Sequence, residues 1–190
     1  MTICLSRPSQ NIRTMQSAVR SMNLAHHPYW SRLWIVQEVM FAVNLVVRFG
    51  SLREDWSTFT TMIKARGANT SPALKVIKHK EQFYDGNPKF HQNFLLYSLM
   101  SEFRHSQARI IHDKVYAPNG LATQETRVQV DYTISELCLA LRVLETITSR
   151  TNSGITDASM DRKKAIAFLI RALELNQRDA SRLKRLDTER

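Results

Sequence analysis

Apolar residues recur three or four positions apart through most of this chain, which is the spacing of amphipathic helices. Leu95, Leu99 and Phe103, for example, fall on one helix face. The run Asn44–Phe49 has the composition of a short strand instead, and Val128–Val130 is a second candidate strand. The pattern therefore predicts a mainly α fold with one or two short strands. Helices are expected over residues 11–25, 30–42, 56–65, 72–83, 91–104, 134–149 and 158–175.

Capping residues sharpen some of these boundaries. Asp55 suits the N-cap of the helix over 56–65, because its carboxylate can accept hydrogen bonds from the first free amides. Pro72 suits the first turn of the next helix, where its missing N–H costs nothing. Thr133 and Glu136 fit a capping box at the start of the helix over 134–149. The charged tail beyond residue 175 is expected to fray.

The densest apolar segment lies between Pro28 and Phe41 and predicts a helix that is buried on all sides. On a helical projection Trp34 and Val36 lie on different sides, so no face is left for water. Polar side chains nevertheless interrupt the segment, and a buried carboxylate such as Glu38 needs a partner or a cavity. Spacing alone favours an ion pair with a neighbouring element. A carboxylate that faces a ligand pocket is the alternative.

The net charge of +10 raises the question of a polyanionic partner. Three segments, 1–70, 71–133 and 134–190, have 8 basic against 3 acidic residues, 8 against 6, and 11 against 8. These excesses of +5, +2 and +3 are spread thinly, and the chain has no recognised nucleic-acid-binding motif. We therefore expect no specific nucleic-acid binding. No apolar run approaches the ~20 residues of a membrane-spanning helix, so the expected location is the cytoplasm.

The cysteines and histidines do not have the spacing of a metal site. Cys4 and Cys138 are 134 positions apart, and His105 and His112 are separated by seven positions with a break between them. Cys138 falls on an apolar helical stripe, which indicates a reduced thiol in the core. No metal site and no evident cofactor site are predicted from these residues.

The segment PYWSRLWIVQEVMFAVNLVVRFGS resembles a known family block. In heterokaryon-incompatibility (HET) domains an aromatic-Ser-Arg-x-Trp-x-x-Gln-Glu helix is followed by a hydrophobic strand. Arg32, Trp34, Gln37 and Glu38 stand at the matching positions here. Because tryptophan and glutamine are uncommon and the spacing is fixed, the match is specific.

A second block strengthens the resemblance, which covers residues 28–150. Asp113-Lys-Val-Tyr116 matches the family's Asp-Lys-Val-Tyr, and Asp131-Tyr132 matches the Asp-Tyr pair before its next helix. Residue by residue, Asp113 is interpreted as a helix cap or ion-pair partner. Tyr116 and Tyr132 are interpreted as core aromatics with a hydrogen-bonded hydroxyl.

The chain also departs from the family pattern. Pro118-Asn119 replaces a Leu-Leu pair, and we expect Pro118 to stop the helical turn that begins at Asp113. The family's opening blocks do not occur here and would lie upstream of Met1. The expectation is a truncated or split domain, or a decaying copy.

The resemblance implies a fold and a domain division. HET domains are similar to TIR domains, which are doubly wound α/β domains. Residues 1–133 would then be a partial HET domain, the C-terminal portion of such a fold, and residues 134–190 a helical extension.

The resemblance also implies a function in fungal non-self recognition and programmed cell death. We expect this to depend on protein partners or on self-association. One alternative follows from TIR domains that cleave NAD⁺ with a glutamate: Glu38 would be catalytic, and Arg32, Trp34 and Gln37 would shape its surroundings. Another alternative is an inactive or regulatory fragment. Whether the chain is an enzyme stays open.

Overall fold

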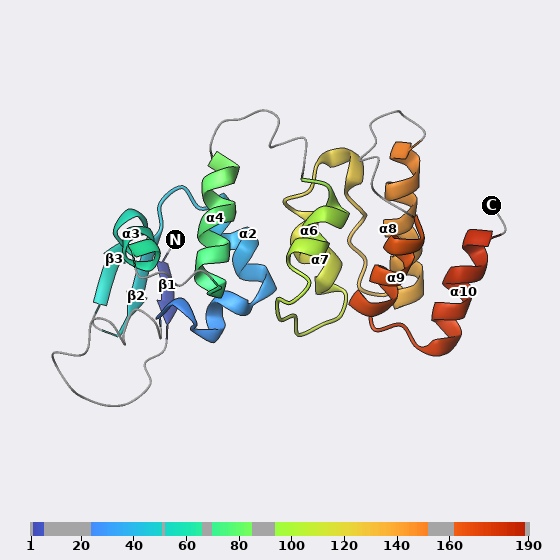
Figure 1. Ribbon diagram of the computed structural model, residues 1–190, viewed down its shortest axis with the longest axis horizontal. Coiled ribbons are helices and arrows are strands. Elements are labelled where there is room, and N and C mark those ends of the chain that lie inside the picture. The colour runs from blue at the N-terminus through green and yellow to red at the C-terminus, as the bar shows by residue number, and fades with distance from the viewer. Residues whose placement is uncertain are drawn as a thin grey trace. The chain divides into compact units, whose positions relative to one another are not determined.

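The computed structural model describes residues 2–5, 24–50, 52–65, 70–84, 94–151 and 162–188 (Figure 1). These residues belong to two compact units, Met1–Phe90 and His91–Arg190, each with its own buried apolar core. The family resemblance implies a different division, after residue 133, where the partial HET domain would end. That division describes the extent of a family and not a compact unit, so it stays a prediction.

A small sheet lies in the first unit. It consists of β1 (Thr2–Leu5), β2 (Val46–Phe49) and β3 (Leu52–Asp55), in that order. The central strand β2 pairs parallel with β1 and antiparallel with β3. Gly50, between β2 and β3, has a φ of 61°, a conformation that glycine adopts without a Cβ clash. Sequence predicted β2 but missed β1 and β3, which at four residues each are too short to show an alternating pattern.

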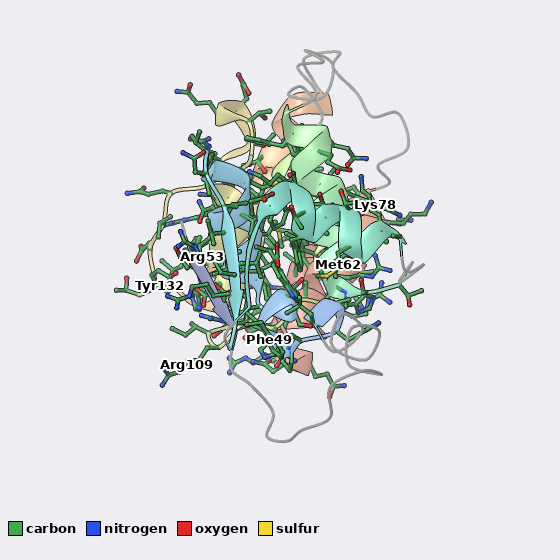
Figure 2. The ribbon with its side chains drawn as sticks, turned by 90° about the vertical axis from the view of Figure 1, so that its left-hand side faces the viewer. Phe49, Arg53, Met62, Lys78, Arg109 and Tyr132 are labelled. Carbon is green, nitrogen blue, oxygen red and sulfur yellow. The ribbon has the colours of Figure 1, made fainter. Side chains whose placement is uncertain are left out.

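The first unit also contains four helical elements: η1 (Pro28–Ser31), α2 (Leu33–Phe41), α3 (Trp56–Ala65) and α4 (Pro72–Tyr84). Helix α3 contacts β2 and β3, as the side view shows, and α4 contacts α2, α3 and η1 (Figure 2). Trp30 of η1 stacks on Phe59 of α3, with ring centroids 5.3 Å apart. The Trp30 Nε1 donates to the carbonyl of Leu24 at 2.8 Å. The indole therefore fills the core without leaving a buried donor unpaired.

The helix predicted over 30–42 is interrupted. Arg32 has an extended backbone (φ −71°, ψ 132°) between the 3₁₀ helix η1 and α2. The predicted helices over 56–65 and 72–83 agree with α3 and α4 within one residue. Apart from residues 24 and 25, the helix predicted over 11–25 lies outside the described residues.

The second unit consists of short helices arranged around α8. The elements are α6 (Leu96–Glu102), α7 (Asp113–Asn119), η2 (Gln124–Thr126), α8 (Glu136–Thr151), α9 (Arg162–Ala172) and α10 (Gln177–Thr188). Helix α8 contacts α6, α9 and α10, and α7 contacts α6. Leu139, Leu169 and Leu183, from α8, α9 and α10, are fully buried. The apolar faces of three helices therefore share one core.

Several predictions for this unit were wrong. Helix α7 continues through Pro118 and ends one residue later at Asn119, so the proline lies in the last turn and does not stop the helix before it. Val128–Val130 forms no strand. The predicted capping box fails because Ser135, not Thr133, accepts a hydrogen bond from a helix amide, that of Cys138, at 3.3 Å.

Two further corrections concern exposure and the C-terminal tail. The Cys138 thiol is exposed and not in the core, so its apolar neighbours in the sequence stripe misled the prediction. The tail beyond residue 175 does not fray at once but forms α10. The prediction of a mainly helical chain is confirmed, with three strands in the described residues instead of one or two. Within these same ranges no helix is long and apolar enough to span a bilayer.

Lys80 of α4 caps the C-terminal end of α2. Its Nζ donates to the carbonyls of Val39 at 2.8 Å and Ala42 at 2.9 Å, and the residue is only 8% exposed. The last carbonyls of a helix lack intrahelical partners and carry partial negative charge, so a buried ammonium suits them. Burial lowers the pKa of Lys80 below its ordinary value.

Replacing Lys80 with methionine should therefore destabilise the first unit. The stem would still pack, but the buried carbonyls would lose their donor, which costs about 2 kcal/mol of unfolding free energy. Urea denaturation of Lys80→Met, compared with Lys78→Met at an exposed position of the same helix, measures this. Equal stability of the two variants would contradict the capping role.

Asp55 is the N-cap of α3, as predicted. Its Oδ1 accepts from the Thr58 amide at 2.9 Å and the Ser57 hydroxyl at 2.7 Å, and its Oδ2 from the Thr58 hydroxyl. These hydrogen bonds, that of the Thr58 amide foremost, lower the pKa of Asp55 to about 2.

The cap should therefore contribute stability above pH 3.8 and lose it as the pH falls towards about 2, because protonation of Asp55 weakens the native state more than the unfolded one. Thermal melts of the wild type and of Asp55→Ala should differ near neutral pH and converge at low pH. A constant difference at all pH values would contradict this expectation.

Candidate functional site

The family-like residues of α2 lie on the more accessible side of that helix. Leu33, Ile35, Val36, Val39 and Met40 are buried. Trp34 and Gln37 are half-buried, whereas Glu38 and Phe41 are exposed, and helical spacing places these four on one side. The prediction that the helix is buried on all sides, with Trp34 almost inaccessible, was wrong. Trp30, at 2% exposure, is the core tryptophan instead.

Arg32 lies just before α2 and is exposed. Its guanidinium carbon lies 5.4 Å from the ring centroid of Tyr29, within the range of a cation–π contact. Its backbone N–H donates to the carbonyl of Tyr29 at 3.2 Å. The extended backbone at Arg32 places its side chain outside α2. The guanidinium therefore contacts Tyr29 of η1 and not Glu38.

Glu38 does not form the buried ion pair that was expected of it. The carboxylate is exposed, and it has no ion pair among the described residues. The charge therefore stays in contact with water and costs the fold little. Phe41, the last residue of α2, is 52% exposed, and its ring lies 6.1 Å from that of Phe83. Val43, just beyond the helix, is 86% exposed. We call Trp34, Gln37, Glu38 and Phe41 the α2 face.

The second family-like block forms a polar network between α7 and the segment that follows η2. Four consecutive contacts pair residues of the helix with residues of the segment, and the two run in opposite directions. His112 bonds the carbonyl of Ile134 at 2.8 Å, and Asp113 accepts from the Tyr132 hydroxyl at 2.8 Å. Further along, Tyr116 pairs with Asp131, and Asn119 pairs with Val128. We call this set the α7 ladder.

Two side chains of the α7 ladder each satisfy both backbone groups of one residue. The Tyr116 hydroxyl donates to the Asp131 carbonyl at 2.8 Å and accepts from its amide at 3.1 Å. The Asn119 amide donates to the Val128 carbonyl and accepts from its N–H, both at 2.9 Å. Tyr116 and Asn119 are three residues apart on α7, and their partners Asp131 and Val128 are three residues apart on the segment. This pairing explains why Val128–Val130 needs no partner strand.

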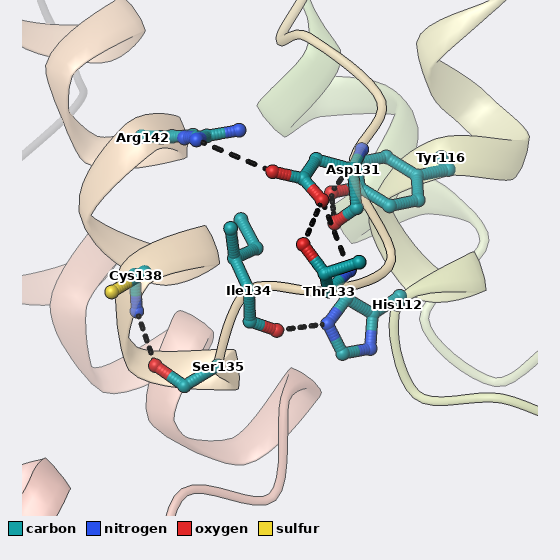
Figure 3. A network of polar contacts seen from close by, with 8 residues as sticks. All are labelled: His112, Tyr116, Asp131, Thr133, Ile134, Ser135, Cys138 and Arg142. Atoms are coloured by element: carbon teal, nitrogen blue, oxygen red, sulfur yellow. Dashed lines mark hydrogen bonds and ion pairs between the residues drawn. The ribbon is translucent and has the colours of Figure 1, made fainter.

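Asp131 turns its side chain to the start of α8 (Figure 3). Its Oδ1 accepts from the Thr133 hydroxyl at 2.6 Å and the Thr133 amide at 3.0 Å, and these bonds lower the pKa of Asp131. Arg142 of α8 lies 3.7 Å from Oδ2. Asp131 therefore orders the turn into α8, which is a structural role.

Both predicted tyrosines have the hydrogen-bonded hydroxyl that was expected of them. Tyr116 is buried, as expected of a core aromatic, but Tyr132 is 46% exposed. Burial of its ring and the hydrogen bond to Asp113 raise the pKa of Tyr132 to about 12. Asp113, itself buried, accepts the hydrogen bond of the Tyr132 hydroxyl. The expected helix cap or ion pair was wrong, because the N-cap of α7 is His112 and Asp113 has no ion pair among the described residues.

Sequence reasoning missed His112 and Asn119. The three-residue spacing of Asp113, Tyr116 and Asn119 could be read from the sequence, but it does not show which segment these side chains pair with, and His112 lies outside the series. Asn119 was interpreted only as a departure from the family's Leu-Leu pair, although its side chain completes the ladder. Among the described residues no three His, Cys, Asp or Glu side chains gather as a metal site.

A scan against protein-family models found no match, and neither did searches of curated proteins and of solved structures. The HET resemblance therefore rests on the two sequence blocks. The geometry separates their roles: the polar groups of the α7 ladder are used within the fold, whereas the charges of Arg32 and Glu38 are exposed.

Replacing Asn119 with leucine, the residue of the family pattern, should destabilise the second unit. Both backbone groups of Val128 would lose their buried partner, at a cost of about 3 kcal/mol. The control is Gln129→Leu on the same segment, where the side chain is exposed and the effect should stay within about 0.5 kcal/mol. Similar unfolding free energies for the two variants would argue against the ladder.

Tyr132 should make stability fall at alkaline pH. Its native pKa of about 12 lies above the ordinary 10.0, so its contribution is complete below pH 10.0 and is lost as the pH rises towards 12. In Tyr132→Phe this part of the pH dependence should disappear. Ultraviolet titration of the phenol, together with melts of both proteins, tests it; an ordinary pKa for Tyr132 would refute the expectation.

Proposed function

We propose that this chain is part of a HET domain that acts in fungal non-self recognition and programmed cell death through assembly with protein partners or with itself. The observation that carries the proposal is the α2 face. The residues that make the first sequence block specific, Trp34, Gln37 and Glu38, lie on the accessible side of α2 and not in the core. A helix needs only apolar residues to pack, so these side chains are free to serve recognition.

The composition of the α2 face suits a protein interface. Aromatic side chains are enriched in the centres of interfaces, where a few anchors supply most of the binding energy. Trp34 and Phe41 are aromatic, and the adjoining Val43 extends the apolar surface. Glu38 adds a hydrated charge that can select a basic partner group.

The finer expectation of a TIR-like, doubly wound α/β fold belongs to the same proposal. The parallel pairing of β1 with β2 supports it, because parallel strands require a crossover connection, and η1 and α2 lie between the two strands in sequence.

Expression in fungal cells tests the proposal. Glu38→Gln keeps the size of the side chain and removes its charge, and because Glu38 is exposed the melting temperature should not change. We expect killing to fall at least tenfold, by loss of a charged contact at an interface. The matched control is Glu81→Gln on α4, which breaks only the exposed ion pair with Lys64.

The outcomes separate the alternatives. Killing that is equal in the two variants would refute a role for the α2 face, and an inert wild type would favour the regulatory or inactive fragment. Cellular NAD⁺ is measured in parallel. A fall in NAD⁺ that depends on Glu38 and precedes death would replace the assembly proposal with the NAD-consuming one.

A further inference from the structure

Two arginines lie directly opposite each other in the sheet of the first unit. Arg48 of β2 and Arg53 of β3 are partners in the antiparallel ladder, so their side chains point to the same face with Cβ atoms about 5 Å apart. Both residues are exposed. We call them the arginine pair. Because like charges at directly opposite positions destabilise a sheet, the pair weakens the fold unless an anion lies between the two guanidinium groups.

The arginine pair lies on the face of the sheet that α3 does not cover. Side chains alternate along a strand, and the buried Ile3 and Val47 belong to the other face, on which α3 packs. Figure 2 shows the same arrangement, with Arg53 and Met62 of α3 on opposite sides of the sheet. Thr2 of β1 is exposed on the arginine face. This face is therefore polar and accessible.

No described residue neutralises the arginine pair. The side chains of Arg48 and Arg53 have no ion pair and no hydrogen bond among the described residues. Glu54 is the partner of Val47 in the ladder and therefore points to the other face. Asp55 belongs to the arginine face, but both of its carboxylate oxygens accept hydrogen bonds at the start of α3. Two adjacent positive charges are therefore available to an anion that another molecule brings.

The charge and spacing of the arginine pair suit a phosphate monoester. A guanidinium binds two oxygens of an anion side by side, and a carboxylate has only two, so one arginine saturates it. A phosphate monoester has three free oxygens and a charge of about −1.5 to −2, which match two guanidinium groups. Only residues 50 and 51 lie between β2 and β3, and so short a connection holds the strands in register. The two arginines are therefore placed before a ligand arrives.

Strand β3 is the last strand of the sheet, and its outer edge can receive a further strand. In the order β1-β2-β3 it pairs with β2 alone. An edge strand offers unpaired N–H and C=O groups, and extended peptides bind such edges through main-chain hydrogen bonds. A residue of the added strand opposite Arg53 would point to the arginine face, about 5 Å from Arg53 and one strand further from Arg48. A phosphate on that residue is within reach of both long side chains.

We propose that β3 and the arginine pair bind an extended segment of a partner protein that contains phosphoserine or phosphothreonine. The edge of β3 holds the main chain of the segment, and Arg48 and Arg53 clamp the phosphate. Binding then depends on whether the partner is phosphorylated, so a kinase and a phosphatase control it. This surface is separate from the α2 face, and the inference does not rest on the proposed function.

Fluorescence anisotropy with the full chain tests the proposal. The probe is a short labelled peptide of alternating valine and threonine with phosphoserine at its centre. It should bind at least tenfold more tightly than the same peptide with serine, because the phosphate adds two charge-assisted contacts. Arg48→Gln and Arg53→Gln should each weaken binding of the phosphopeptide at least tenfold and change binding of the serine peptide by no more than about twofold.

A matched control separates the site from net charge. The double variant Arg48→Gln, Arg53→Gln is compared with Arg109→Gln, Arg178→Gln, which removes two exposed arginines of the second unit. The control should bind the phosphopeptide within about twofold of the wild type. Circular dichroism melts check the fold. Because replacing either member of the arginine pair relieves repulsion, the melting temperature should not fall.

A phosphopeptide with proline on both sides of the phosphoserine tests the role of the β3 edge. Proline has no N–H to donate to a neighbouring strand, so this peptide should bind at least fivefold more weakly than the valine-threonine phosphopeptide. Equal binding of the two phosphopeptides would overturn strand addition. Equal losses in the two double variants, no preference for the phosphopeptide over the serine peptide, or no binding of the phosphopeptide at millimolar concentration would each overturn the phosphate clamp.

Discussion

Backbone polar groups that leave a helix or strand still need partners when they are buried, and in this chain side chains of helices supply them. Lys80 donates to two carbonyls at the end of α2, so α4 and α2 are joined by hydrogen bonds as well as by apolar packing. In the second unit, Tyr116 and Asn119 pair with backbone groups of a segment without regular structure. In both units a long-range contact therefore depends on one polar side chain placed by a helix.

The polar groups of the two family-like blocks differ in their surroundings: those of one block form hydrogen bonds inside the fold, and the charge of the other lies in water. A polar group whose hydrogen bonds are made inside the fold, such as that of Tyr116 or Asp113, has little capacity left for a ligand. A charged group in water, such as Glu38, keeps its capacity but holds nothing together. This contrast gives α7 a structural role and leaves the charge of Glu38 on α2 available to a partner, as the proposed function requires.

Local signals predicted the local structure. The N-cap of α3 at Asp55 could be read from the sequence because the residues that accept and donate its hydrogen bonds lie within three positions of one another. Burial was harder to predict, since an apolar stripe does not say which side of a helix has neighbours. Trp34 and Cys138 were placed in the core for that reason, and the structure leaves Trp34 half-buried and Cys138 exposed. The α7 ladder joins residues 9 to 22 positions apart, and pairings of that range leave no local pattern.

The α7 ladder also bears on how the second unit folds and opens. A helix of seven residues is too short to persist alone in water, and the segment opposite it has no strand partner, so neither is stable before the other is in place. The two should form and open as one cooperative unit. The amide protons of Val128 and Asp131 would then exchange with solvent at the same rate as those of α7, although they belong to a segment without regular structure.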